Sequence, residues 1–566
     1  MKVSITSWFM PAEGHPPWRL ALLGLVLVLP FVALGDVWFS DACQWYGPMI
    51  RDLAESGFLH GFHPMIPPAF VATGALLAMC GMEALRAAML VSCLFYVITV
   101  FPLYGIVRRL WDARTAVWAI FLYLFCPKML WIGGLAGIDS GKLFFLVLMV
   151  YALCRIASAR GWGGYVALTI GTAGLALIRG DGILFSAAAF GSAAVLLAAQ
   201  KQWREFLPLM VATMTSVLML VPWVAWEYKH TGYPVLDSRQ VGAVQKVMKV
   251  LYLATPACRN DGKNRMDEKL AMVFPDAGSE RQPLQVRQPQ VHKKAFKVVR
   301  DGILPRLYIP FFLLGLWLTW RRQSGRKSDQ KTLLAWFFGH AVVWFIVFHL
   351  LMGLEIDERY ILPGIPLALG WSAAGILWCL DQVLKRYVWL LLPIYVCMGI
   401  GVVVALSKGY KMVLNDRMRQ AFAAERQGAE WLRNEGRALA GKPRGILEST
   451  GSFYHRGSGT VVMSVRYYGI PFLADVEVLD PEEIGRVMTA HELLAVCRQF
   501  GVQFIIWRPL FATVCPDLKN VSRLPPGFRV MCDLRALDPG MSLVIIGVED
   551  NLDGRRMGKK EMKSGI

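Results

Sequence analysis

The sequence predicts an α-helical polytopic membrane protein with a soluble α/β domain at its carboxyl end. Of its 566 residues, 55% are hydrophobic and 18% are charged, and the mean hydropathy is +0.43. A water-soluble protein cannot bury that much apolar side chain, whereas a bilayer solvates it directly. Apolar runs of near span length recur through residues 1–406, and charges and turn residues return in residues 407–566. We therefore expect a membrane domain followed by a separate domain of about 150 residues.

The formal net charge of +19 is explained by the positive-inside bias of membrane proteins and does not indicate that the protein binds nucleic acid. The Lys and Arg residues gather in short segments between apolar runs, as the positive-inside bias requires. Examples are RRLWDAR from Arg108 and RRQSGRKSDQK from Arg321. No stacking module or basic recognition helix accompanies them. We expect membrane lipid, and no nucleic acid, among the partners.

The same basic segments predict the orientation of the chain. With these segments and the amino terminus in the cytoplasm, about eleven helices of roughly 20 residues fit the apolar runs. The expected spans lie at residues 19–35, 84–107, 115–135, 143–157, 163–178, 183–199, 206–226, 305–320, 332–352, 361–380 and 388–406. We interpret the first as an uncleaved span rather than a signal peptide, because candidate site residues follow it directly. The first outer loop is then 36–83 and the long outer loop is 227–304.

The long outer loop is itself basic, which the charge bias permits because long loops translocate largely regardless of charge. Within it, VGAVQKVMKVLYL from Val241 mixes apolar and cationic residues at near-helical spacing. This pattern indicates either a helix lying flat on the outer leaflet or an ordinary packed helix.

The carboxyl domain at 407–566 should lie outside, after an odd number of spans. AAERQGAEWLRNEGRAL predicts an amphipathic helix, and RGILEST, VQFIIWRP and MSLVIIGVED predict short buried strands, with PEEIGRVMTAHELLAVCRQFG as a helix between them. Cys497, Cys515 and Cys532 allow one disulfide in this domain, which their spacing does not assign.

Charged residues near the spans fall on one side of the predicted topology. Polar groups at mid-span cost about 2.5–3.5 kcal/mol on insertion scales, so their positions carry information. Five groups of such residues lie in four outer segments: Asp36 and Asp41, His60 and His63, Asp139 and Lys142, Arg179 and Asp181, and Glu355, Asp357, Glu358 and Arg359. The topology therefore brings carboxylates and cations to the same membrane face.

This arrangement suits transfer of sugar from a lipid-phosphate carrier. Cleavage of the anomeric C–O bond leaves a phosphate dianion, which fixed cations stabilise, and the acceptor hydroxyl needs a carboxylate as general base. We predict Asp41 as the base and Asp139 as a second carboxylate. Arg179, with Lys142 or Arg359, is predicted to bind the donor phosphate.

Each candidate also has a plain structural interpretation. Asp36 is a polar residue at the end of a span, and Asp139 is a suitable N-cap for the fourth span. Arg179 and Asp181 suit a structural pair or an interfacial anchor. His63 suits an ordinary loop histidine, and the acids at 355–358 suit a solvated loop tip.

Six features occur in an order that is typical of one family. An acidic residue after the first span leads into an amphipathic segment ending in Ser-Gly (Asp41 to residues 56–57), and a Pro-Pro-apolar-aromatic turn follows at 67–70. The basic corner RRLWDAR comes next, and then an outer tip carrying Asp139 before an apolar helix. The last two features are the basic-Gly tip Arg179-Gly180 and Arg359-Tyr360 with Pro363 at the entry to a later span.

In these features the chain resembles the GT-C superfamily of membrane glycosyltransferases, in particular the aminoarabinose transferases of lipid A and the protein O-mannosyltransferases. The resemblance implies a hexosyl or pentosyl transferase of the bacterial inner membrane that uses an undecaprenyl-type phosphate donor and inverts the anomeric centre. It implies that Asp41 and Asp139 are the catalytic acids and that Arg179 holds the donor phosphate. The acceptor is a lipid, a glycan or a protein, and the carboxyl domain lies in the periplasm.

Two positions depart from the pattern of these relatives. The relatives often carry Lys directly before the Pro-apolar turn, whereas this chain has Ile66, and the nearest polar candidate for the phosphate is His63. Ala42 follows Asp41, so the usual acidic pair is reduced and no metal or other cofactor is predicted, although Asp41 with Asp139 could hold one divalent cation. Asp181, Glu358 and Tyr360 complete the predicted site as substrate-binding residues.

Two other functions stay open. A transporter or flippase of lipid-linked sugars would place ionisable groups near mid-membrane and often shows two similar halves, and neither feature is evident. An O-antigen ligase or polymerase would hold its chemistry in one large late loop, which residues 227–304 could supply.

Overall fold

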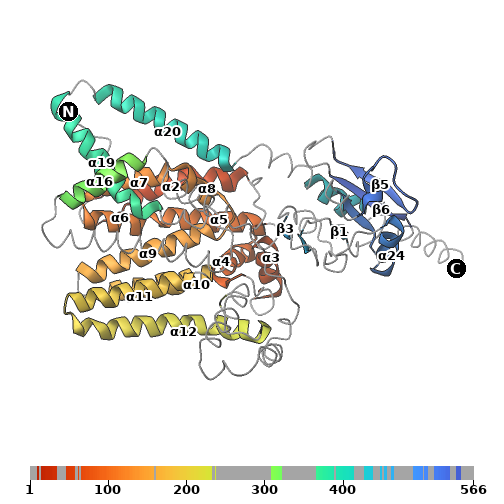
Figure 1. The fold of residues 1–566 in the computed structure, drawn as a ribbon, viewed down its shortest axis with the longest axis horizontal. Helices are drawn as coiled ribbons and strands as arrows, with labels where there is room; N and C mark the ends of the chain where they lie inside the picture. Colours follow the sequence, from red (N-terminus) through yellow and green to blue (C-terminus); the bar gives the residue numbers. More distant parts are fainter. Residues whose placement is uncertain are drawn as a thin grey trace, which may run out of the picture. The chain divides into compact units, whose positions relative to one another are not determined.

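The computed structural model of the chain forms two compact units (Figure 1). It describes residues 9, 11, 15–34, 42, 46–57, 62, 66–158, 161–180, 182–231, 236, 308–321, 365–387, 391–413, 426–436, 446–448, 452–454, 461–463, 489–500, 502–507, 515–535 and 543–549. One unit comprises Met1–Gly35 and Met49–Val413, and the other comprises Asp36–Pro48 and Leu414–Ile566.

The first unit is built of helices, as the apolar runs predict. They are α2 (Trp18–Leu34), α3 (Gly47–Ser56), α4 (Pro68–Met79), α5 (Ala84–Ile98), α6 (Val100–Leu110), α7 (Ala113–Leu124), α8 (Pro127–Gly134), α9 (Asp139–Ser158), α10 (Trp162–Ile178), α11 (Gly182–Ala199), α12 (Phe206–Thr231), α16 (Ile309–Arg321), α19 (Ile365–Arg386) and α20 (Leu391–Val413). The expected span at 332–352 lies outside the described residues, and each of the other expected spans coincides with one or two of these helices.

Three described helices are long and apolar enough to cross a bilayer by themselves, and a bent pair makes a fourth. The three are Ala84–Leu110, Asp139–Ala157 and Trp203–Lys229, and the pair is α7 with α8. Other apolar helices, such as α10 with its 17 residues, are shorter. The number of spans therefore stays a prediction.

The span expected at 115–135 is a bent pair rather than one straight helix. α7 and α8 meet at 62°. Cys126 between them has an extended backbone, with φ −74° and ψ 118°, which is the conformation that a residue before proline prefers. Pro127 then begins α8 without an N–H to donate. A sequence-local effect therefore breaks the helix.

The first outer loop of the sequence analysis contains two helices. α3 is amphipathic, as expected: Met49, Ile50 and Leu53 are buried, whereas Asp52 and Glu55 are exposed. α4 is apolar and packs against α5 and α10, so this part of the loop adds to the helical core.

α10 packs against α9, α11 and α12 (Figure 1). Its contacts with α12 follow a parallel register. Thr169 Oγ1 donates to the Ala212 carbonyl at 3.3 Å, and the Thr172 and Ser216 hydroxyls lie 2.9 Å apart. Further along, Ala176 of α10 and Trp223 of α12 belong to one buried cluster. Residues near 176 therefore lie level with residues 220–224.

The second unit contains a sheet with helical segments on both faces, which confirms the predicted α/β class. Its strands are β1 (Ile446–Glu448), β4 (Phe504–Trp507), β5 (Phe528–Asp533) and β6 (Val544–Val548), in the order β1-β4-β6-β5. β1 and β4 are parallel, and β6 is antiparallel to both β4 and β5. A separate hairpin joins β2 (Ser452–Tyr454) to β3 (Val461–Met463).

Alternate residues of the central strands β4 and β6 pack into two separate hydrophobic cores, one on each face of the sheet. Ile505 and Ile546 pack with α24 (Ala490–Phe500) and with residues 515–521. Phe504 and Ile545 pack on the other face with Ala429 and Leu432 of the helical segment at 426–436. The strands predicted from RGILEST, VQFIIWRP and MSLVIIGVED are confirmed as β1, β4 and β6.

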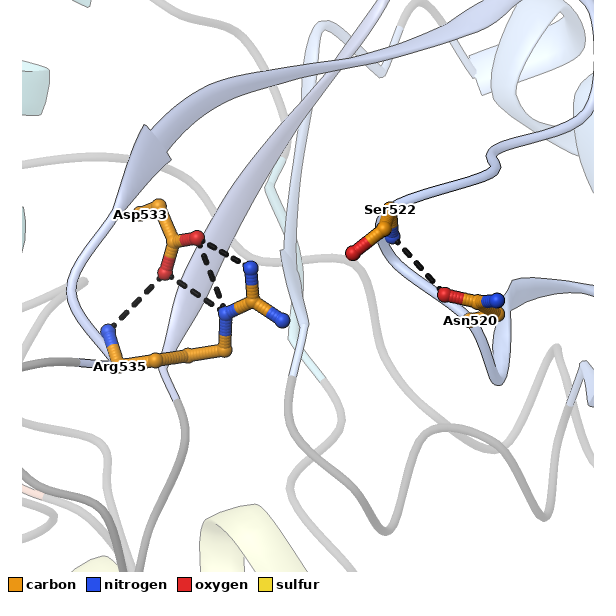
Figure 2. A network of polar contacts seen from close by, with 4 residues as sticks. All are labelled: Asn520, Ser522, Asp533 and Arg535. Carbon is orange, nitrogen blue, oxygen red and sulfur yellow. Dashed lines mark hydrogen bonds and ion pairs between the residues drawn. The ribbon is translucent and has the colours of Figure 1, made fainter.

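β5 was missed by the sequence analysis, because its residues alternate irregularly between buried and exposed positions. Beyond its end, Arg535 Nε donates to both oxygens of Asp533 at 2.9 Å (Figure 2). These hydrogen bonds hold the pKa of the Asp533 carboxyl below its usual value. The Asn520 side chain accepts from the Ser522 N–H at 3.1 Å and closes a separate turn. Cys497 and Cys515 are buried thiols, and Cys532 is a half-buried thiol.

Candidate active site

Four charged side chains are buried among the described residues, and all four belong to the helical unit. They are Asp139, Lys142, Arg179 and Glu227, with 8%, 1%, 9% and 0% of their surface exposed. Charged side chains are almost never this buried unless they are paired. We call these four residues the buried charge set, and we call the end of the bundle where α9 begins and α10 ends the site end.

Asp139 is positioned by a loop that α5 holds. Ser92 Oγ donates to the Gly137 carbonyl and accepts from the Gly137 N–H, each at 3.0 Å. Ser140 Oγ donates to the same carbonyl at 3.3 Å. Asp139 then starts the first turn of α9, where the unpaired N–H groups and the helix dipole favour a carboxylate.

Arg179 is positioned by the turn between α10 and α11. Its backbone is extended, with φ −154° and ψ 128°, so α10 ends at Ile178. The turn closes through the Gly182 N–H, which donates to the Arg179 carbonyl at 2.8 Å. A Cβ on Gly182 would lie 2.5 Å from the Leu175 carbonyl oxygen. Only glycine fits there, and the tight turn fixes where the Arg179 side chain begins.

Arg179 and Asp139 meet as a buried ion pair. Arg179 Nη1 donates to Asp139 Oδ1 at 3.1 Å, and the two side chains are 11% and 12% exposed. The start of α9 and the end of α10 also approach closely, since a Cβ on Gly141 would lie 2.9 Å from Ile178 Cδ1. Two residues that the sequence analysis assigned to different outer tips are therefore in contact.

Lys142 brings a second cation to the same place. It follows Asp139 by three residues on α9, so both side chains lie on one face of the helix. Its Nζ lies 5.4 Å from the centroid of the Phe185 ring on α11, a cation–π geometry. α9 and the end of α10 thus supply two cations and a carboxylate at the site end, and α11 supplies the Phe185 ring.

Glu227 is a member of the buried charge set that the sequence analysis missed. The expected span stopped at residue 226, but α12 continues to Thr231. Trp223 and Trp226 stack with ring centroids 4.7 Å apart, and Phe62 lies edge-on to Trp223 at 5.5 Å. The signal in the sequence was the aromatic run PWVAW, which continues the apolar face of the helix directly to the glutamate.

The other predicted site residues lie outside the described residues. These are Asp41, His63, Asp181, Glu358, Arg359 and Tyr360. Whether they meet Arg179 and Asp139 therefore stays a prediction. In the described part of the chain, no three His, Cys, Asp or Glu side chains gather in a way that could hold a metal ion.

Comparison with known proteins gives a profile match over part of the chain and a shared fold. A sequence profile described as dolichyl-phosphate-mannose-protein mannosyltransferase matches residues 62–226. The crystal structure of ArnT from Cupriavidus metallidurans bound to undecaprenyl phosphate is similar with a TM-score of 0.56 and 12% identity, covering 96% of this chain and 98% of that chain.

A second similar structure is the oligosaccharyltransferase of Archaeoglobus fulgidus. Its complex with Zn and sulfate gives a TM-score of 0.53 at 14% identity, covering 87% of this chain and 68% of that one. No curated protein sequence matches the chain. The profile match over residues 62–226 indicates a glycosyltransferase, and the two solved structures show the fold that the chain shares with such enzymes.

The profile match supports the enzyme class, and the structural likenesses at such low identity establish the fold. The structural likenesses confirm the predicted fold class, and the profile match favours an enzyme over a transporter. The matched region includes α9 and α10 and therefore the Asp139–Arg179 pair. The pair therefore lies inside the part of the chain that the profile matches.

Proposed function

We propose that this GT-C enzyme transfers a monosaccharide from a polyprenyl-phosphate donor to a lipid, glycan or protein acceptor at the outer face of the bacterial inner membrane. The observation that supports this most directly is the buried Asp139–Arg179 pair with Lys142 one turn away. Two fixed cations beside one carboxylate, at one end of an apolar bundle, suit a phosphate carried on a lipid. The similar ArnT structure contains undecaprenyl phosphate, which favours a donor of that type.

Arg179 would hold the donor phosphate. A guanidinium presents five N–H donors in one plane, so a contact with a carboxylate is compatible with a bidentate contact with phosphate. Asp139 would fix the plane of the guanidinium, and Lys142 would add a point charge. As the phosphate leaves with a second negative charge, these preorganised cations stabilise it in the transition state.

The transfer itself would be a direct displacement. The acceptor hydroxyl oxygen attacks the anomeric carbon while Asp41 accepts the hydroxyl proton. The C–O bond to the phosphate breaks, its electron pair stays on the phosphate oxygen, and polyprenyl phosphate leaves. Attack from the face opposite the phosphate inverts the anomeric centre.

The remaining predicted residues have supporting roles in this proposal. His63 and Arg359 would contact the phosphate, and Asp181, Glu358 and Tyr360 would hydrogen-bond sugar or acceptor hydroxyls. The displacement needs no cofactor. One divalent cation between Asp41 and Asp139 is the alternative arrangement, and loss of transfer on chelation, with recovery on adding Mg²⁺ or Mn²⁺, would favour it.

The test is sugar transfer in membranes that contain the protein and a radiolabelled polyprenyl-phosphate sugar. The lipid-linked sugar that accumulates in a strain lacking the protein identifies the donor to use. We expect Asp41→Asn to lower kcat by about 10²–10⁴-fold, the usual contribution of a general base. Glu55→Gln, an exposed acid on α3, serves as the control. Transfer by Asp41→Asn at the wild-type rate would remove Asp41 as the base.

The carboxyl domain would select the acceptor in this proposal. α20 ends at Val413, so truncation after that residue removes Leu414–Ile566 and keeps the helices from α2 to α20. We expect the truncated protein to retain donor binding and to lose transfer to the native acceptor. Unchanged transfer to that acceptor would assign the domain another role.

A further inference from the structure

Glu227 stands out because neither the sequence analysis nor the family match includes it. The matched region ends at residue 226. Yet its side chain has no exposed surface, and it belongs with Asp139, Lys142 and Arg179 to the only charged side chains buried among the described residues. Two of these four are cations and two are acids, so the buried charge set is electrically balanced.

The register between α10 and α12 places Glu227 near the site end of the bundle. Thr172 is level with Ser216, and Ala176 packs in one cluster with Leu220 and Trp223. Both helices rise by 1.5 Å per residue. Continuing this register places Trp223 at the level of Arg179, and Glu227 follows one turn, about 6 Å, further along α12. Trp223 and Glu227 are four residues apart and share the face of α12 that meets α10.

Two segments pack against the aromatic residues beside Glu227: one lies near Leu236, after α12, and the other contains Phe62. Trp223 Nε1 donates to the Leu236 carbonyl at 2.9 Å, which ties the backbone beyond α12 to the helix. Phe62 packs edge-on against Trp226 at 6.0 Å as well as against Trp223. A carboxylate on a helix whose neighbours are locked in this way acts as a fixed charge.

We infer that Glu227 is a positioning residue of the site: its carboxylate balances the buried cations and keeps Arg179 and Lys142 in place for the donor phosphate. This inference rests on the proposed function. Asp139 by itself would leave the set with one excess positive charge, and an unbalanced buried charge is costly. Without Glu227, the cations would relieve this cost by moving toward water and away from the phosphate position.

Two substitutions separate charge from packing. Glu227→Gln keeps the shape of the side chain and removes its charge, whereas Glu227→Asp keeps the charge and shortens the chain. We expect Glu227→Gln to lower kcat/KM for the donor by roughly 10–100-fold, the usual effect of a supporting group that orients a functional one. Glu227→Asp should retain more activity than Glu227→Gln. The reverse order would show that Glu227 acts by packing and would overturn the inference.

A double-mutant cycle tests whether Glu227 acts through Arg179. In the Arg179→Lys background, Glu227→Gln should lower kcat/KM by less than about threefold further, because coupled residues are non-additive. If the fold-loss in kcat/KM of the double variant equalled the product of the two single losses, the inference would be overturned. Glu55→Gln removes an exposed acid and should leave kcat/KM within about twofold of wild type, as distant surface changes do.

The same cycle separates this inference from the proposed function. If Arg179→Lys alone left transfer unchanged, the role proposed for Arg179 would fail. If Arg179→Lys lowered transfer and Glu227→Gln did not, only the role of Glu227 would fail. Thermal unfolding of each purified variant shows whether it is folded, and a variant that is unfolded at the assay temperature is assayed below its unfolding midpoint.

Discussion

Arg179 Nη1 donates a hydrogen bond to Asp139 Oδ1 across 3.1 Å, and this buried contact joins the residue that follows α10 to the first turn of α9. Each partner is set by its own local structure. Asp139 follows the loop that Ser92 holds, and Arg179 follows the end of α10 at a turn that needs Gly182. The contact thus fixes a cation at the site end of the bundle.

The Asp139–Arg179 pair should matter much more for stability than an exposed pair of the same length. Arg114 Nη2 and Asp381 Oδ1 also lie 3.1 Å apart, but their side chains are 46% and 44% exposed. Removing one partner of a buried pair costs about 3–5 kcal/mol, whereas an exposed pair contributes about 0–1 kcal/mol. We expect Asp139→Asn to lower the unfolding midpoint in detergent clearly and Asp381→Asn to leave it nearly unchanged. Equal shifts would contradict this.

Gly182 should not tolerate a side chain. An added Cβ would meet the Leu175 carbonyl oxygen at 2.5 Å, whereas a Cβ on Gly191 of the same helix meets nothing within 4 Å. Gly182→Ala should open the turn, lower the unfolding midpoint and reduce sugar transfer by displacing Arg179. Gly191→Ala should be neutral or stabilise by about 0.5–1 kcal/mol, because alanine is the better helix former. Similar behaviour of the two variants would refute the role of the turn.

Ser92→Ala should loosen the loop before Asp139. The substitution leaves the buried Gly137 N–H without the hydroxyl that it donates to, and an unsatisfied buried group costs about 1–3 kcal/mol. We expect a lower unfolding midpoint together with a lower transfer rate. Ser56→Ala, at an exposed end of α3, is the matched control. A Ser92→Ala enzyme as stable and active as the control would show that the loop holds its shape by itself.

Cys497 in the carboxyl domain should resist alkylation. Its burial, and then the neighbouring Cys515, raise the pKa of its thiol to about 12, so only about 10⁻⁴ of it is thiolate at pH 8. The exposed Cys80 should react first with iodoacetamide, as measured by mass spectrometry of peptides. Cys497 should become reactive when urea unfolds the domain. Reaction of both thiols at one rate in the folded protein would contradict the buried position.

The orientation of the bundle can be tested with reporter fusions. Fusions ending after residues 57, 138 and 180 should report the outer side, and fusions ending after residues 112 and 204 should report the cytoplasm. The physical reason is the positive-inside bias of the short basic segments. Fusions that placed Asp41, Asp139 and Arg179 on opposite sides would remove the common site on which the proposed transfer depends.

Much of the helical unit could be predicted because burial in a bilayer needs continuous apolar runs. The span expected at 143–157 lies within α9, and the one expected at 163–178 is α10 with one more residue at its start. The prediction was incomplete where a charge interrupts the run. It ended the seventh span at residue 226, whereas Glu227 is buried and α12 continues to Thr231. A hydropathy pattern counts Glu227 as polar, and only the packed neighbours reveal that it is inside.

The sequence by itself determined the class of the protein, because its apolar content needs a bilayer. It also singled out Asp139, Lys142 and Arg179 as candidates. Only the tertiary structure decided that Arg179 contacts Asp139 and that Glu227 joins the buried charges. These features depend on the approach of helices that are far apart in the chain, and such contacts leave no periodic pattern in any single segment.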